Sequence, residues 1–332
     1  MVLAPIVAEV SLGSISLARA WVIPILVPIY GAGALFIREV VRRTGGGFAT
    51  LLIMGVAYGL VEEGLVLQSL TSPHLYGAAE WAPRLFGVNT AYTELNLVYH
   101  PVFSVTIPIV LVELGFARHG TAPYLRRGGL ITTGVIALLG AALLRVSVPP
   151  TEDPGYTMPL TAMLIVAVAV VAVAAVALRA RLGPVRPAEP PRVLVVACAA
   201  TGVTFGFLAM LYPFAGARQS LFTHGSWALL PMTGAALIVA ATICALRRWS
   251  AGPEWTPRHL LAACLGALVG HTAFGLLGAA DSTPDRVFLL AIGVLTAAIG
   301  FGALRKTATA DADLATTHGR SDHEAVASSE AS

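Results

Sequence analysis

Residues 162–178, which read AMLIVAVAVVAVAAVAL, decide the fold of this chain. None of these side chains ionises, and the run lacks the polar–apolar alternation of a membrane barrel strand. Only helices and closed barrels satisfy their backbone polar groups in lipid. A helix needs about 20 residues, at about 1.5 Å each, to cross roughly 30 Å of hydrocarbon. Extended to 158–179, the run therefore predicts a membrane-spanning helix.

Eight further apolar runs of similar length lie along the chain. With 56% hydrophobic and 12% charged residues and a mean hydropathy of +0.78, the composition excludes ordinary water-soluble packing. We predict an all-α fold, a polytopic transmembrane bundle of about nine helices whose main partner is the lipid bilayer. The other predicted spans are 19–37, 48–70, 95–116, 128–148, 193–213, 224–246, 259–280 and 285–304.

Basic residues concentrate in alternate connections, and acids such as Glu80 and Asp285 occupy the others. The positive-inside rule then places the N-terminus outside and the C-terminus in the cytoplasm. Lys306 is the one lysine among 21 basic residues, which is typical of a GC-rich bacterial genome. We therefore expect a multi-pass protein of the bacterial cell membrane. The basic clusters are Arg38, Arg42 and Arg43; Arg118, Arg126 and Arg127; Arg179, Arg181, Arg186 and Arg192; Arg247, Arg248 and Arg258; and Arg305 with Lys306.

Three segments follow from this topology. Residues 1–18 lack an early positive charge and carry Glu9 inside an apolar stretch, so we interpret them as an interfacial N-terminal helix and not as a signal peptide. Residues 19–306 form the predicted transmembrane bundle. Residues 307–332 show no apolar periodicity, which predicts a disordered cytoplasmic tail.

Several functional classes are disfavoured by the motifs that the sequence lacks. The basic clusters are short and separated by apolar runs, so no nucleic acid is expected as a partner. The sequence contains no Gly-rich phosphate loop before a Lys-Ser/Thr pair, no His-Glu-x-x-His, no Gly-x-Ser-x-Gly and no Cys-x-x-Cys. We expect no nucleotide, no cofactor and no metal, although a Glu/His/His site remains geometrically open.

A pair of carboxylates interrupts the span 48–70, in the stretch Gly55-Val-Ala-Tyr58-Gly-Leu-Val-Glu62-Glu63. A carboxylate deep in a membrane helix costs about 2.5–3.5 kcal/mol on insertion scales, so such groups usually serve a function. Adjacent helical residues point about 100° apart, so the two glutamates cannot both face one small ligand squarely. We expect one Glu to react while the other positions, with a purely structural role as the alternative.

Two histidines fall at a depth similar to that of the pair. Glu62 lies about 21 Å from the start of its span, and His100 and His271 lie about 24 and 20 Å from the basic ends of theirs. Pro101 leaves open whether His100 is inside its helix or just outside it. His271 could simply form a hydrogen bond across helices. The predicted catalytic residues are Glu62, Glu63, His100 and His271, and the predicted substrate-binding residues are Tyr58, Gln68 and the stripe of Asn96 and Ser104 on either side of His100.

The paired glutamates and the following histidine resemble the CAAX-protease and bacteriocin-processing family of intramembrane glutamate proteases. The resemblance covers about residues 55–105. Members have an Arg four residues after the second Glu and a Phe four before the first His, where this chain has Leu67 and Asn96. They also have an Asn or similar residue four after a later His, and His271 lacks that partner. The resemblance implies a hydrolase acting within the bilayer, in which Glu62 and His100 activate water.

The leading hypothesis is an integral membrane enzyme that uses the Glu pair and His for acid/base chemistry on a lipid-soluble or membrane-embedded substrate. Peptide hydrolysis is one version. An isoprenoid cyclase using a protonated Glu is another, although an aromatic content of 8% offers few rings to stabilise a cation. A proton-coupled transporter would also need an intramembrane Glu. A non-catalytic membrane protein is the remaining class.

Overall fold

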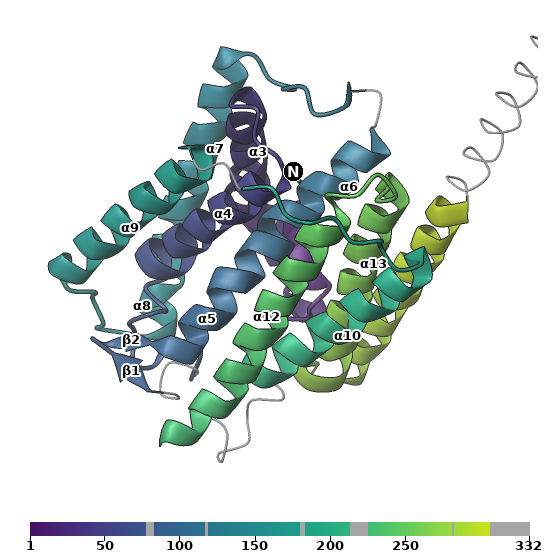
Figure 1. Ribbon diagram of the computed structural model, residues 1–332. Helices are drawn as coiled ribbons and strands as arrows, with labels where there is room; N and C mark the ends of the chain where they lie inside the picture. The colour runs from purple at the N-terminus through teal and green to yellow at the C-terminus, as the bar shows by residue number, and fades with distance from the viewer. Residues whose placement is uncertain (78–82, 117–118, 180–182, 213–224, 281, 306–332) are drawn as a thin grey trace, which may run out of the picture.

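The computed structural model describes residues 1–77, 83–116, 119–179, 183–212, 225–280 and 282–305 (Figure 1). The predicted helical fold is confirmed, because this part of the chain holds nine helical segments long and apolar enough to cross a membrane. The predicted tail, residues 307–332, lies outside the described residues, and the orientation of the termini stays a prediction. The nine segments are Leu17–Arg43, Phe48–Val66, Thr90–Gly115, Arg127–Glu152, Leu160–Arg179, Val193–Leu211, Gly225–Trp249, Pro257–Ala279 and Thr283–Arg305.

Several of these segments combine helical elements of different pitch. The first half of the chain contains α1 (Leu3–Pro5), η1 (Ile6–Val10), η2 (Leu17–Val22), α2 (Ile23–Leu26), η3 (Val27–Ala32), α3 (Gly33–Arg43), α4 (Phe48–Gly59), η4 (Leu60–Val66), η5 (Leu75–Gly77), α5 (Thr90–Tyr99), η6 (His100–Thr106) and α6 (Ile107–Gly115). The second half contains α7 (Arg127–Ser147), α8 (Pro149–Glu152), α9 (Leu160–Arg179), α10 (Val193–Leu211), η9 (Gly225–Ala228), α12 (Leu229–Trp249), α13 (Pro257–Phe274) and η10 (Gly275–Ala279). A two-residue antiparallel hairpin, β1 (Arg84–Leu85) and β2 (Val88–Asn89), precedes α5.

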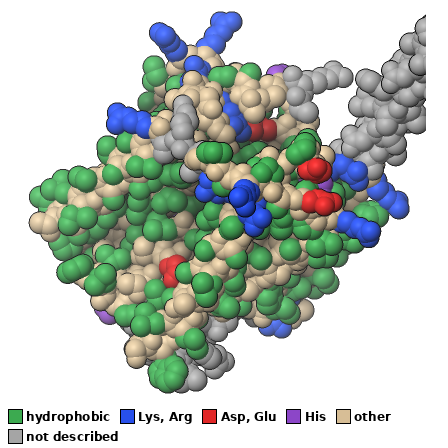
Figure 2. All heavy atoms as spheres, viewed as in Figure 1, with side chains coloured by type: hydrophobic (Ala, Val, Ile, Leu, Met, Phe, Trp, Pro, Cys, Tyr) green, Lys and Arg blue, Asp and Glu red, His purple; other side chains and the backbone are tan. Residues whose placement is uncertain are grey.

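The spans divide into an interior set and a peripheral wall. In Thr90–Gly115 67% of the most apolar window is buried, whereas in Leu160–Arg179 the share is 6%. The interior spans Phe48–Val66, Thr90–Gly115 and Pro257–Ala279 carry ionisable groups, whereas Leu160–Arg179 is almost pure Ala, Val, Leu and Ile. Figure 2 shows the consequence: hydrophobic side chains cover most of the visible face, and Arg side chains gather mainly toward one end.

Glycines let the interior helices approach closely. A Cβ on Gly55 of α4 would lie 2.4 Å from Cα of Pro101 in η6, and one on Gly59 would lie 3.3 Å from Cβ of His100. A Cβ on Gly266 of α13 would lie 2.1 Å from the carbonyl oxygen of Ala197 in α10. Such contacts are possible only without a side chain. The first contact brings the Glu pair and His100 onto neighbouring backbones.

Five short π-helical segments interrupt the regular helices: η1, η3, η4, η6 and η10. Pro28 and Pro101 lie at the starts of η3 and η6. A proline lacks the N–H for the regular helical bond and clashes with the carbonyl four residues before it, and a wider turn is one way to accommodate this. In η4 the wider turn is seen directly, since Leu67 N donates to Glu62 O, five residues back, at 2.8 Å. Such bulges occur frequently at functional sites.

The N-terminal segment contributes to the described core. Within it a short α1–η1 helix packs among other elements, with Ala4, Val7 and Ala8 buried, while the interfacial position of residues 1–18 stays a prediction. A Cβ on Gly275 would lie 2.0 Å from the carbonyl oxygen of Leu12. The small and apolar side chains of this segment suit an interior position, and the insertion carries Glu9 inside with them.

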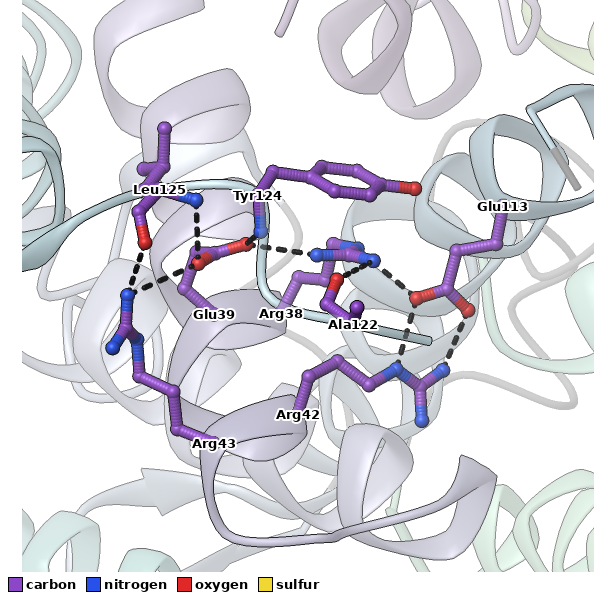
Figure 3. Close-up of polar contacts among 8 residues, drawn as sticks. All are labelled: Arg38, Glu39, Arg42, Arg43, Glu113, Ala122, Tyr124 and Leu125. Atoms are coloured by element: carbon purple, nitrogen blue, oxygen red, sulfur yellow. Dashed lines mark hydrogen bonds and ion pairs between the residues drawn. The ribbon is translucent and has the colours of Figure 1, made fainter. Parts of the chain in front are cut away.

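Arg and Glu side chains of α3 and α6 form a network of ion pairs and hydrogen bonds (Figure 3). Glu113 on α6 forms a bidentate pair with Arg42, at 2.9 and 2.6 Å, and also lies 3.0 Å from Nε of Arg38. Glu39 accepts from Arg38 at 2.8 Å and from the backbone amides of Tyr124 and Leu125. The guanidinium of Arg38 also stacks 3.3 Å from the centroid of the Tyr124 ring. The network ties α3, α6 and the loop before α7 together.

Candidate functional site

His100 lies between the two carboxylates. Its Nδ1 is 3.2 Å from Oε2 of Glu62, and its Nε2 is 3.1 Å from Oε1 of Glu63. Although adjacent helical residues point in different directions, both glutamates contact the same imidazole ring. The two side chains approach the ring from opposite nitrogens, and they do so from the widened turn η4. All three side chains are almost completely buried, with exposures of 1%, 6% and 2% for Glu62, Glu63 and His100.

The two glutamates have different hydrogen-bonding environments. Glu63 Oε2 accepts from Ser69 Oγ and from Tyr92 OH, the latter at 3.3 Å, while its Oε1 faces His100. Neither oxygen of Glu62 has a hydrogen bond to the described part of the chain, although Oε2 faces His100 across the 3.2 Å contact. Buried polar atoms without partners are rare and call for an explanation. Glu63 is thus fixed in place, and Glu62 keeps accepting capacity for another group.

The stripe predicted on the third span is present. Ser104 Oγ lies 3.0 Å from His100 Nδ1, and Asn96 Nδ2 donates to the carbonyl of Tyr92 at 2.9 Å. The helix runs unbroken from α5 into η6, and His100 N bonds to Asn96 O. Pro101 left open whether His100 lies inside its helix or just outside it. This hydrogen bond places His100 inside the helix.

The other two predicted substrate-binding residues lie at the edges of this cluster. Tyr58 is buried with its hydroxyl unpaired within the described structure, and its ring centroid is 5.9 Å from that of His100. Gln68 is fully buried just after η4, in a left-handed conformation with φ of 60°. Its side-chain oxygen accepts from Met158 N at 3.2 Å, so it anchors the loop before α9.

His271 belongs to a neighbouring cluster and does not contact the glutamates. Its Nδ1 lies 3.0 Å from Ser11 Oγ, and its Nε2 lies 3.0 Å from Tyr99 OH. Its ring stacks on Phe103 with centroids 4.2 Å apart. Tyr99 links His271 to His100, because its ring also packs edge-on against His100 with centroids 5.6 Å apart. The structure therefore shows the hydrogen bond across helices that sequence reasoning held open for this residue.

A cavity of about 830 Å³ adjoins the cluster. Four of the predicted site residues line it: Glu62, Glu63, His100 and Asn96. The other four do not line it: His271, Tyr58, Gln68 and Ser104. Residues from η1, η3, η4, η6 and η10 all contribute to the lining, so the five π-helical segments converge on one space. A cavity of this size suits a small-molecule or peptide-segment ligand.

Sequence reasoning missed Glu9 and most of the tyrosines of the cavity. Glu9 lies in the wall and accepts from Tyr30 OH at 2.5 Å and from Ser14 Oγ. A carboxylate within an apolar stretch was the available signal for Glu9. For the tyrosines no comparable signal existed, because Tyr30, Tyr92 and their counterparts are spread over distant segments. The tyrosines in the wall are Tyr30, Tyr76, Tyr92, Tyr99 and Tyr212.

The Glu/His/His arrangement that sequence reasoning left open for a metal does not form in the described structure. Both ring nitrogens of His271 are engaged by Ser11 and Tyr99, away from Glu62. No group of three or more His, Cys, Asp or Glu side chains among the described residues has the geometry of a metal site.

Comparison with known proteins places the chain in a family. No curated protein and no solved structure matches it. A family model described as an uncharacterized membrane protein family matches residues 1–318, which is nearly the whole chain. The matched range includes Glu62, Glu63, His100 and His271. The nine apolar helices agree with that description. The chain is a multi-pass membrane protein and belongs to this uncharacterized membrane protein family.

Proposed function

We propose that this protein is an integral membrane enzyme that performs acid/base chemistry on a lipid-soluble or membrane-embedded substrate, with peptide hydrolysis as the leading reaction. One observation carries the proposal: Glu62 and Glu63 contact opposite nitrogens of His100 in the wall of a cavity of about 830 Å³. The same residues carry the resemblance to the CAAX-protease and bacteriocin-processing family. We further propose the bacterial cell membrane as its location, with the basic connections in the cytoplasm.

Glu62 is the proton-transfer residue in this proposal because it keeps acceptor capacity at the cavity wall. It accepts a proton from water while the water oxygen bonds to the substrate carbonyl carbon and the carbonyl electrons move to oxygen. When the tetrahedral intermediate collapses, the C–N bond breaks and Glu62 delivers the proton to the leaving amine. Water and peptide are converted to a carboxylic acid and an amine, and Glu62 returns to its starting state.

His100 and Glu63 position this residue. Nδ1 of His100 faces Glu62, and Nε2 faces Glu63, which is itself held by Ser69 and Tyr92. Because Ser69 and Tyr92 hold Glu63, and Glu63 contacts His100, the imidazole is fixed in turn. A fixed imidazole keeps the Glu62 carboxylate within the narrow range of positions that catalysis requires.

A second reaction, isoprenoid cyclisation, is favoured by one specific feature of the cavity. The modest aromatic content suggested few rings, but five of the eight tyrosines lie in this wall. Aromatic faces attract cations, so this wall suits a carbocation formed when a protonated Glu62 donates its proton to an alkene. After ring closure the cation loses a proton to the Glu62 carboxylate, which leaves an isomer of unchanged mass. Hydrolysis and cyclisation then share Glu62 and differ in the substrate.

One experiment separates these reactions. Purified protein in detergent micelles is incubated with a pool of apolar membrane-spanning peptides or with linear polyprenes, and products are identified by mass spectrometry. Peptide cleavage supports the hydrolase, and a polyprene isomer of unchanged mass supports the cyclase. Glu62→Gln must abolish whichever product forms, whereas Glu94→Gln, on α5 outside the cavity wall, must not.

The proposal has clear contrary outcomes. Product formation that survives Glu62→Gln and His100→Ala would show that the cluster does not perform the chemistry. Flux of a substrate across liposomes with no product would instead identify a proton-coupled transporter.

A further inference from the structure

The wall of the cavity carries a strong excess of acidic groups. Its described residues include five carboxylates, and the basic groups are the exposed Arg19 at the mouth and His100 in the interior. His100 faces two of the carboxylates at once, so one imidazole serves Glu62 and Glu63 together. The five carboxylates are Glu9, Glu62, Glu63, Glu152 and Asp285.

Two of the remaining acids have no cationic partner among the described residues. Glu9 is bonded to hydroxyl groups, those of Tyr30 and Ser14, and Glu152 is exposed at the mouth. Asp285 is different, because it accepts from Leu17 N at 2.7 Å and lies near Arg19. Negative charge is therefore spread from the mouth to the interior, where field lines concentrate between apolar walls.

A second and independent feature points to a ligand. Glu62 is 99% buried and lies in the wall, and neither of its oxygens has a hydrogen bond in the described structure. Its Oε2 contacts Nδ1 of His100 at 3.2 Å, and its Oε1 has no such contact. Tyrosine rings surround the same space, and aromatic faces and carboxylates together form the usual site for an organic cation. Burial of the acids makes each pairing with a cation stronger than it would be at a surface.

We propose that the cavity binds the cationic group of a lipid-soluble ligand, an ammonium or related organic cation, between Glu9, Glu62 and the tyrosine rings. This inference rests on the cavity used in the proposed function and names the substrate class for it: a membrane-embedded substrate with a positive charge beside its reacting bond. Binding requires no turnover, so it can be tested separately from the reaction.

The test uses two probes of the same shape and opposite charge. Tetraphenylphosphonium and tetraphenylborate are titrated into the full chain in uncharged detergent, and heat release gives each dissociation constant. The cation is expected to bind at least about 10-fold more tightly than the anion. Equal affinity, or preference for the anion, would overturn the inference.

Single substitutions locate the site. Glu9→Gln and Glu62→Gln should each weaken binding of tetraphenylphosphonium by about 10-fold, and Glu152→Gln by about 3-fold or less because that residue is exposed. Glu94→Gln is the matched control and should leave the dissociation constant unchanged. Each variant is first checked for a monodisperse elution profile and a wild-type helical spectrum. Unchanged binding in folded Glu9→Gln and Glu62→Gln proteins would refute the site.

Competition distinguishes two sources of the cation. A single-chain alkyl amine represents a free lipophilic amine. An apolar peptide with one Lys represents a basic membrane peptide, and the same peptide with Gln in place of Lys is the uncharged control. Displacement of tetraphenylphosphonium by either cation supports the inference and identifies the source. Displacement by neither, or equally by the Gln peptide, contradicts it. His100→Ala should keep probe binding even where it abolishes turnover, so failure of the reaction and failure of the cation site give different results.

Discussion

The unequal environments of Glu62 and Glu63 predict unequal effects on stability. Glu63→Gln leaves one acceptor oxygen for three donors: Ser69 Oγ, Tyr92 OH at 3.3 Å and His100 Nε2 at 3.1 Å. A hydrogen bond to a charged group contributes about 1.5–3 kcal/mol. Losing one of these bonds and weakening another should therefore lower the free energy of unfolding by about 2–4 kcal/mol.

Glu62→Gln should affect activity much more than stability. It breaks no hydrogen bond to the described residues, and although it removes the carboxylate 3.2 Å from His100 Nδ1, it leaves His100 its second carboxylate, Glu63, at 3.1 Å. It also removes a buried charge that is costly to desolvate. We expect the free energy of unfolding to change by less than about 1 kcal/mol, or to rise. Activity should nevertheless disappear, because Glu62 transfers the proton.

The assay is reversible unfolding in mixed micelles, followed by circular dichroism, for the two variants and the Glu94→Gln control. We expect wild type, Glu62→Gln and the control to have similar free energies of unfolding, and Glu63→Gln to have a clearly lower one. If Glu62→Gln lost as much stability as Glu63→Gln or more, the assignment of Glu63 as the fixed partner would be wrong.

Three further predictions concern packing, charge and orientation. Gly55→Ala should cost about 1–3 kcal/mol of unfolding free energy and reduce turnover, because its Cβ would lie 2.4 Å from a backbone atom of η6; Gly115→Ala, with open space around it, should not. Glu113→Gln should lower the free energy of unfolding by about 3–5 kcal/mol, since it leaves two buried arginines without their shared carboxylate. In a variant without the native cysteines, Thr151→Cys should react with an impermeant maleimide in intact cells and Glu189→Cys only after lysis; the reverse pattern would invert the topology.

Much of the fold could be predicted from the sequence because membrane helices are specified locally. A run such as 162–178 needs no partner to indicate a helix, and its composition also indicates the lipid-facing wall. The spacing of Asn96, His100 and Ser104 placed them on one stripe for the same reason. Comparable depths of Glu62 and His100 in their spans predicted that the two could meet, and they do, at 3.2 Å.

The features that could not be predicted depend on tertiary contacts. A regular rotation of 100° per residue points Glu62 and Glu63 in different directions, but a π-helical turn changes that rotation, and its occurrence depends on packing against η6. Likewise, His271 had the right depth but is turned toward Ser11 and Tyr99. Depth fixes the height of a side chain in the bilayer and leaves its direction around the helix open.

The packing of residues 1–12 could not be predicted from their composition. Their composition suits a membrane interface as well as a bundle interior, and the choice is made by distant glycines such as Gly31 and Gly275, which admit the backbone of this segment. Glu9 enters the cavity only through that insertion. A site assembled from both ends of the chain has no local signature.

The most direct measurement of the central claim is turnover in ¹⁸O-labelled water, with wild-type protein, Glu62→Gln and Glu94→Gln compared under the same conditions. The proposal predicts that wild type and Glu94→Gln release a peptide fragment carrying one ¹⁸O atom in its new carboxyl group, and that Glu62→Gln releases none. A labelled fragment formed at the wild-type rate by Glu62→Gln would contradict the assignment of proton transfer to this carboxylate.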